Sequence, residues 1–148
     1  MTTPSYYTDF GAWARAQATA LRAKDWPALD VAHLAEEIES LGNEQAHAVE
    51  SHLIILVQHL LKCAHQPPPR RGWLRSIDNA RDEIALRLRR NPHLRPELES
   101  LLSLAYPRGR RRAIRETGLP PATFPETCPW SVAQVLDEAF WPEEVPRC

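Results

Sequence analysis

Apolar side chains, with a few polar ones among them, recur at steps of three and four along one stretch in the first half of the chain. The stripe consists of Leu34, Ile38, Leu41, Gln45, Val49, His52, Leu56, His59 and Cys63. This spacing places them on one face of an α-helix that opens at Asp30, a good N-cap. The phase passes Gly42 without a slip, which favours one long helix, straight or bent, over a break at Gly42 with Asn43 capping a new helix. The segment Leu53–Leu61 is apolar nearly all round and is expected to form the centre of the core.

Prolines and the few glycines fall mostly between periodic segments, which is typical of helices joined by rigid turns. A first helix is expected to begin near Thr8 or Asp9 and to end at 25–27, and one of its faces comprises Phe10, Trp13, Ala14 and Leu21. The prolines after Gln66 end the long helix. A third helix is expected from about Trp73 to Arg90, with Ile77, Ala80, Ile84 and Leu88 inward.

A fourth helix is expected to carry Pro96 in its first turn, where proline is tolerated. Its apolar face comprises Leu98, Leu101, Leu102 and Ala105. Pro107 and Gly109 are expected to kink or split it, because proline lacks an N–H and clashes with the preceding turn. Gly118 is a plausible residue just past its end. Ser131-x-x-Gln134 is a capping box that predicts a short last helix.

These segments predict an all-α protein, a single-domain bundle of about five helices over residues 1–148 with a long central helix. No run alternates with a period of two. No stretch reaches the roughly 20 apolar residues of a membrane span, and the first residues lack the features of a secretory signal. The three cysteines, Cys63, Cys128 and Cys148, are odd in number and widely spaced, unlike a disulfide framework. We expect a cytoplasmic protein.

Several short motifs together resemble one bacterial family, known as domain of unknown function 29. They are Tyr7-Thr8-Asp9-Phe10 with Trp13, the run 34–42 (LAEEIESLG), His59-Leu60-Leu61-Lys62 before Gln66-Pro67, Glu116-Thr117-Gly118-Leu119, and Phe124-Pro125 with Cys128-Pro129. The resemblance covers nearly the whole chain. It implies a compact helical protein and brings no activity, cofactor or catalytic residue. The family usually has an aromatic residue at the position of Cys63 and no proline at the position of Pro107.

Charge is distributed unevenly along the chain. Residues 66–117 carry 13 Lys or Arg against 6 Asp or Glu, whereas 1–65 carry 4 against 8 and 118–148 carry 1 against 5. The basic cluster comprises Arg108, Arg110, Arg111, Arg112 and Arg115. Such a cluster can neutralise phosphates, but the net charge of −1 favours pairing with the acidic ends of the same bundle. We expect at least one of the arginines at 110–112 to be paired internally.

Two histidines, His52 and His59, lie on the long stripe. They are about 10.5 Å apart along a helix axis, too far to share one metal ion without further ligands. His59 and Cys63 are one turn apart, a spacing at which the two side chains can chelate a metal ion, and this is the alternative hypothesis. We interpret both histidines as hydrogen-bonded core residues.

The remaining candidates favour structure over chemistry. Glu36 and Glu39 are expected on a solvated face, and Glu37 is expected to pair with an arginine of the third or fourth helix. The five tryptophans are expected to pack in the core and at helix joints. No phosphate-binding loop or nucleophile motif is present. The leading hypothesis is a non-enzymatic module, without a cofactor, that contacts another protein. The first alternative is a metal-dependent protein or enzyme with its site near His59 and Cys63. The second alternative is a protein that binds the phosphate backbone of a nucleic acid through Arg108–Arg115, and it is not favoured.

Overall fold

The computed structural model describes residues 4–66 and 71–142, and no strand occurs among them. The α-helices are α1 (Phe10–Arg22), α2 (Val31–His65), α3 (Arg71–Arg90), α4 (Leu98–Thr117) and α5 (Val132–Leu136). Short 3-10 helices, η1 (Trp26–Ala28), η2 (Pro92–Glu97) and η3 (Pro121–Thr123), lie between them. The all-α class and the long central helix, continuous across Gly42, are confirmed. No helix in the described ranges is long and apolar enough to cross a bilayer.

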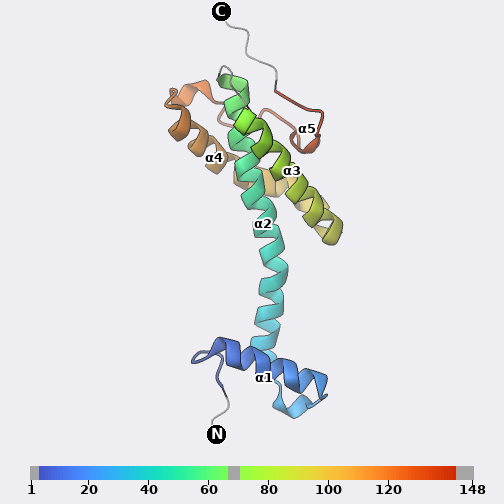
Figure 1. The fold of residues 1–148 in the computed structure, drawn as a ribbon. Coiled ribbons are helices and arrows are strands. Elements are labelled where there is room, and N and C mark those ends of the chain that lie inside the picture. The colour runs from blue at the N-terminus through green and yellow to red at the C-terminus, as the bar shows by residue number, and fades with distance from the viewer. Residues whose placement is uncertain (1–3, 67–70, 143–148) are drawn as a thin grey trace, which may run out of the picture. The chain divides into compact units, whose positions relative to one another are not determined.

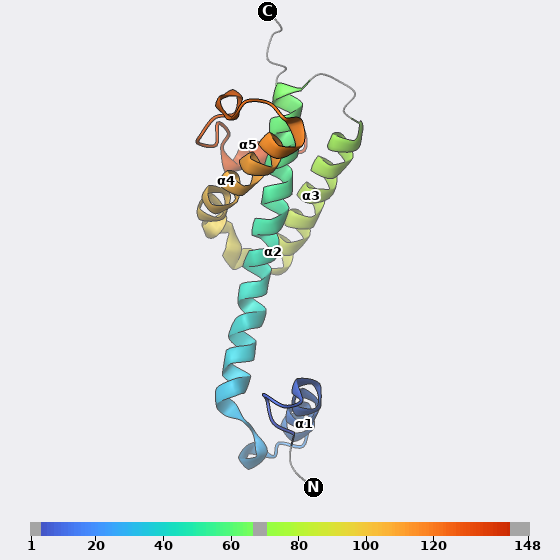
Figure 2. The same ribbon diagram turned by 90° about the vertical axis from the view of Figure 1, so that its left-hand side faces the viewer.

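The chain groups into two compact units, Met1–Glu44 and Gln45–Cys148, and α2 contributes to both. The single domain expected over residues 1–148 stays a prediction. In the second unit, α3 and α4 lie on either side of the C-terminal part of α2 (Figures 1 and 2). The inward residues expected on α3 and α4 are all buried: Ile77, Ala80, Ile84, Leu88, Leu98, Leu101, Leu102 and Ala105. They pack against the segment of α2 between Val49 and Cys63 as one apolar core.

The first unit is built around α1. Asp9 caps α1 as expected, because its carboxylate accepts a hydrogen bond from the backbone N–H of Ala12 at 3.1 Å. The buried residues of α1 are Trp13, Gln17 and Ala20. Phe10 and Leu21, expected on the same face as Trp13, are 50% and 45% exposed. The reason is that α1 buries only a narrow strip, spaced by four and three residues, against the segment that leads into α2.

Helix α4 runs through Pro107 as one helix, so the expected split does not occur there, and the alternative expectation of a kink stays a prediction. Pro107 is exposed, so water can satisfy the carbonyl that its ring deprives of a partner. Gly109 is buried in the middle of the helix and faces α2. A β-carbon at this position would lie 2.7 Å from Cγ1 of Val57 and 2.9 Å from the carbonyl oxygen of Ile54. Gly109 therefore allows the close approach of two helices, which is a different role from helix breaking.

One buried arginine fixes the C-terminal segment to α3. Arg81 is 3% exposed; its Nε donates to the carbonyl of Val135 and its Nη2 to that of Phe140, both at 2.9 Å.

The capping box at Ser131 and Gln134 starts α5 as expected. Gly118 follows α4 in the left-handed conformation, with φ of 68°. Three of the five tryptophans, Trp13, Trp73 and Trp130, are buried or half-buried, whereas Trp26 and Trp141 are exposed.

Candidate functional site

The N-terminal part of α2 presents an exposed apolar face to solvent. Val31, Ile38 and Leu41 are 67%, 66% and 60% exposed, and Leu34 between them is half-buried. We call these four residues, Val31, Leu34, Ile38 and Leu41, the apolar stripe. The periodic face of α2 is therefore not covered in its first part. The same face of α2 becomes part of the core only from Val49 onward, where α3 and α4 cover it.

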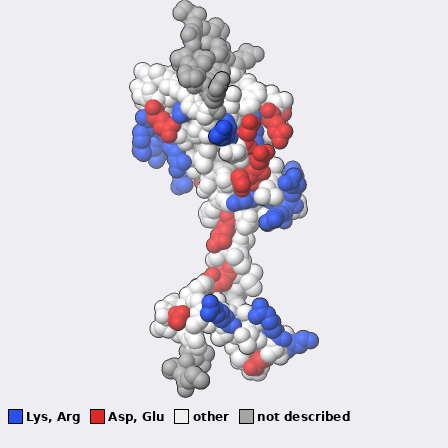
Figure 3. Space-filling model, in the orientation of Figure 1, with Lys and Arg blue, Asp and Glu red and all other residues white. Residues whose placement is uncertain are grey.

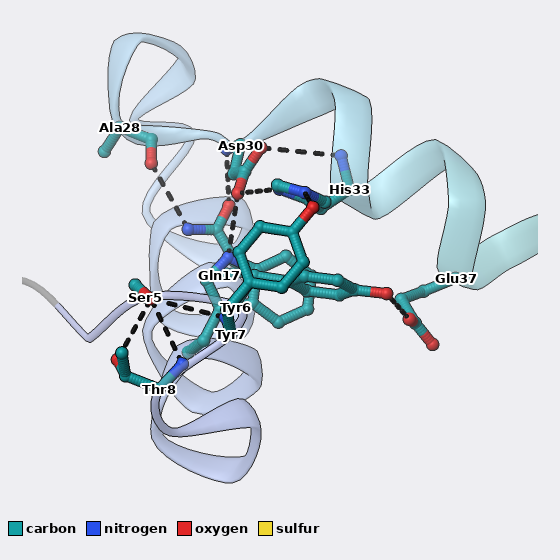
Figure 4. Close-up of polar contacts among 10 residues, drawn as sticks. Ser5, Tyr6, Tyr7, Thr8, Gln17, Ala28, Asp30, His33 and Glu37 are labelled. Atoms are coloured by element: carbon teal, nitrogen blue, oxygen red, sulfur yellow. Dashed lines mark hydrogen bonds and ion pairs between the residues drawn. The ribbon is translucent and has the colours of Figure 1, made fainter.

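A different face of this helical segment is used inside the first unit. Asp30, His33 and Glu37 lie one turn apart and face α1 and the residues before it (Figure 4). Tyr6 donates a hydrogen bond from its hydroxyl to the Glu37 carboxylate, and its ring stacks on His33 with centroids 4.0 Å apart. Glu37 therefore pairs with a tyrosine, and the prediction that it pairs with an arginine is wrong. Because these contacts occupy the face at 30, 33 and 37, the apolar stripe beside it stays outside.

Asp30 is the centre of this polar cluster. Its carboxylate accepts from the indole Nε1 of Trp13 at 3.1 Å and lies 2.7 Å from Nδ1 of His33. The Gln17 side chain accepts from the backbone N–H of Asp30 at 2.7 Å. The hydrogen bond from His33 is the main cause that lowers the pKa of Asp30, and the bond from Trp13 adds to it. The cluster thus fixes the start of α2 on α1.

The cluster also forms a hydrogen-bonded chain from Tyr7 through His33 to Asp30. Because the ionised Asp30 carboxylate can only accept, Nδ1 of His33 carries a proton toward it. Nε2 of His33 lies 3.1 Å from the Tyr7 hydroxyl, which completes the chain. All its polar groups are occupied by neighbours within the unit, which is the arrangement of a helix cap. Sequence reasoning missed the cluster because its members lie far apart along the chain.

The pH dependence of the cluster has a definite sign. The hydrogen bond to Glu37 raises the pKa of Tyr6 to about 12, and burial raises the pKa of Tyr106 to about 12 as well. The stabilising contribution of Tyr6 is therefore complete below its ordinary pKa of 10.0 and is lost as pH rises through 12. The contribution of Asp30 is complete above its ordinary value of 3.8 and is lost as pH falls through the lowered one.

We predict that Tyr6→Phe removes one of two phenols that ionise near pH 12. The measurement is a titration of phenolate absorbance on the wild type, on Tyr6→Phe and on Tyr106→Phe. Tyr106→Phe should remove the other phenol that ionises near pH 12. If the phenol lost in Tyr6→Phe were one that ionises near pH 10, the contact with Glu37 would not exist in solution.

The basic cluster divides into two parts. Arg110 is held internally: Nη2 donates to the carbonyl of Pro121 at 2.8 Å, and Nε donates to that of Phe124 at 3.2 Å. An internal partner therefore exists, but it is backbone carbonyl oxygen and not a carboxylate. The other four, which we call the arginine face, surround a hollow of about 390 Å³ on α4: Arg108, Arg111, Arg112 and Arg115.

The arginine face is poorly neutralised within the described part of the chain. Arg108 lies 3.8 Å from the Glu50 carboxylate and is largely exposed. Arg111 and Arg112 make no ion pair or hydrogen bond with described residues. Figure 3 shows basic side chains gathered over α4, with a smaller group of acidic side chains directly beside them. The positions 108, 111, 112 and 115 follow steps of three and four and therefore point the same way.

His59 and Cys63 lie one turn apart in the second unit, as their spacing requires. The ring Nδ1 of His59 lies 2.8 Å from the carbonyl oxygen of Ile55, and Cys63 is buried. His52 is half-buried, 3.9 Å from the Glu83 carboxylate, and desolvation lowers its pKa. Among residues 4–66 and 71–142, no three His, Cys, Asp or Glu side chains gather where they could hold a metal ion. The role of His59 and Cys63 stays a prediction.

Comparison with known proteins bears on the chain as a whole. The family described as domain of unknown function DUF29 matches residues 5–141, which is nearly its full length. No curated protein and no solved structure matches. The family resemblance inferred from the sequence motifs is confirmed.

Proposed function

We propose that this chain, which belongs to the family described as domain of unknown function DUF29, is a non-enzymatic helical module that acts by contacting another protein. The proposal places the contact on the apolar stripe of α2. It places the protein in the bacterial cytoplasm, because three widely spaced cysteines are typical of a reducing compartment. No cofactor belongs to this proposal.

The observation that carries the proposal is the exposure of the apolar stripe. Burying a Val, Leu or Ile side chain is worth about 1.5–3 kcal/mol, so three such residues left 60% or more exposed represent binding free energy that the chain does not use itself. Exposed apolar residues that stand singly need no explanation. Here they share one helix face at regular spacing, and grouped apolar patches of this kind mark protein interaction surfaces.

The test compares three forms of the full chain in extract from the host. We predict that a protein cross-links to the wild type and to Glu36→Ala, and that it no longer does so in the double variant Ile38→Asp, Leu41→Asp. Glu36 is exposed on the same helix but outside the stripe, so it is the matched control. All three forms should unfold within about 0.5 kcal/mol of one another, because the replaced side chains are exposed. A double variant that retains every cross-link of the wild type would contradict the proposal.

The alternative of a metal-dependent protein or enzyme has less support. It rests on two ligands, His59 and Cys63, and a zinc site normally uses three or four protein ligands. The Nδ1 atom of His59 already has a backbone neighbour, the carbonyl oxygen of Ile55. Equimolar zinc, iron or copper that copurifies with the wild type and is absent from His59→Ala would favour this alternative.

A second candidate function is binding of a phosphate backbone, and the arginine face supports it. We predict that changing Arg108, Arg111, Arg112 and Arg115 to Gln leaves the free energy of unfolding nearly unchanged. The dependence of nucleic-acid affinity on salt should flatten by about one unit for each phosphate that an arginine no longer neutralises. The measurement is binding to a short duplex at several salt concentrations.

Arg110→Gln is the matched control for the arginine face. It removes hydrogen bonds to the carbonyls of Pro121 and Phe124, so it should lower stability by about 1–2 kcal/mol and leave the salt slope unchanged. If the four-fold variant binds the duplex with the wild-type slope, the arginine face is a solvated surface and not a phosphate site.

A further inference from the structure

The apolar stripe follows the heptad pattern of a coiled coil. With Val31 as position a, Leu34 is d, Ile38 is the next a and Leu41 is the next d. β-Branched residues at a combined with leucine at d favour a parallel pair of helices. We infer that the stripe packs against the same stripe of a second copy of this chain, as a short parallel two-stranded coiled coil. This inference rests on the proposed function and identifies the partner as a second copy.

The charges beside the stripe select the parallel orientation. In this register Glu37 and Glu44 occupy the g positions, whereas Ala35 and Gly42 occupy the e positions. An antiparallel pair would set g against g and bring glutamates of the two chains together, and like charges repel. A parallel pair sets each g glutamate against a small, uncharged e residue. Glu37 is in addition held by Tyr6 of its own chain.

Gly42 supports a contact on this side of α2. Glycine inside a helix costs about 1 kcal/mol relative to alanine. A β-carbon at Gly42 would have no described atom within 4 Å, so no packing inside the described chain calls for glycine there. At an e position, beside the seam, the missing side chain allows a neighbouring helix to approach closely.

The stripe is short, but its helix is already formed. α2 runs without interruption from Val31 to His65, so a second copy does not have to nucleate a new helix. Two a and two d positions per chain nevertheless make a small contact. The dimer should therefore be weak and depend on protein concentration.

The first experiment measures mass against concentration for the full chain. Between about 1 µM and about 500 µM, the mean mass should rise from 16.9 kDa toward twice that value, because an interface of this size is weak. Ile38→Asp should weaken the dimer at least about 10-fold, since it places a charge in the seam. The control Glu36→Ala, at the outer f position, should dimerise like the wild type. A wild type that stays monomeric at about 500 µM overturns the inference.

The second experiment establishes orientation by disulfide formation. In a background with Cys128→Ser and Cys148→Ser, a cysteine is introduced singly at position 31 or at position 41. A parallel pair brings like positions together, so Val31→Cys and Leu41→Cys should each cross-link with themselves. Glu36→Cys should not. Cross-links that form only when Val31→Cys and Leu41→Cys chains are mixed would show an antiparallel pair and overturn the inference.

The outcomes separate this inference from the proposed function. If the wild type is monomeric but its apolar stripe still captures a different protein, the inference of a second copy is wrong and the proposed function stands. If the double variant Ile38→Asp, Leu41→Asp has the same mean mass as the wild type and captures the same proteins, both the inference and the proposed function are wrong.

Discussion

Leu56→Ala lowers the free energy of unfolding by about 2–5 kcal/mol, a large loss for a single truncation. Leu56 is 0% exposed on the part of α2 that is apolar nearly all round, and it belongs to the continuous core formed with α3 and α4. Truncation removes three buried carbon atoms and leaves a cavity that the surrounding helices fill only in part. Urea unfolding followed by helical circular dichroism measures the loss.

Ser51→Ala is the matched control for Leu56→Ala. Ser51 is exposed on the same helix, so its replacement should change stability by no more than about 0.5 kcal/mol. The slope of free energy against urea should be the same in all three proteins, because the surface exposed on unfolding hardly changes. Equal stabilities for Leu56→Ala and Ser51→Ala would mean that the face of α2 assigned to the core is wrong.

The helices of the second unit could be predicted from the sequence because their signals are local. The period of apolar residues, the cap at Ser131 and the glycine at 118 are each read within one or two turns. α3 and α4 then have only one apolar face to bury, and the central part of α2 is the most apolar surface available. Local pattern and tertiary packing agree here, which is what makes a fold predictable.

The first part of α2 shows where local patterns stop being informative. Periodicity indicates that Ile38 and Leu41 share an apolar face, but it does not say what covers that face. The contact between Tyr6 and Glu37 spans 31 residues and has no local signature. Formal charges can be counted from sequence, and the count predicts a carboxylate partner for at least one of the arginines at 110–112. The partners that Arg110 has in the structure are backbone carbonyl oxygens, which carry no formal charge and cannot be counted in this way.

Gly109 is a second place where a local rule and tertiary packing conflict. Within the fourth helix, glycine is normally a weak point, and alanine would gain about 1 kcal/mol in helix propensity. In the structure, the expected effect of alanine on stability is reversed from a gain to a loss. The added methyl carbon of Gly109→Ala would lie 2.7 Å from Cγ1 of Val57 and 2.9 Å from the carbonyl oxygen of Ile54. Because one of these atoms belongs to the backbone of α2, a side-chain rotation cannot relieve the overlap, and the two helices must separate.

We therefore predict that Gly109→Ala lowers the free energy of unfolding by about 1–3 kcal/mol despite its better helix propensity. Gly72→Ala, at an exposed helical glycine with open space around it, should leave stability unchanged or slightly raised. Val57→Ala removes Cγ1 but not the carbonyl of Ile54, so the double variant Gly109→Ala, Val57→Ala should be less destabilised than the sum of its single changes, yet not restored to the wild type. A double-mutant cycle on these variants measures the coupling energy between positions 109 and 57. A loss smaller than the sum of the single losses identifies overlap with α2 as the cause of the destabilisation. A Gly109→Ala protein as stable as the wild type would instead show that α4 does not approach α2 this closely.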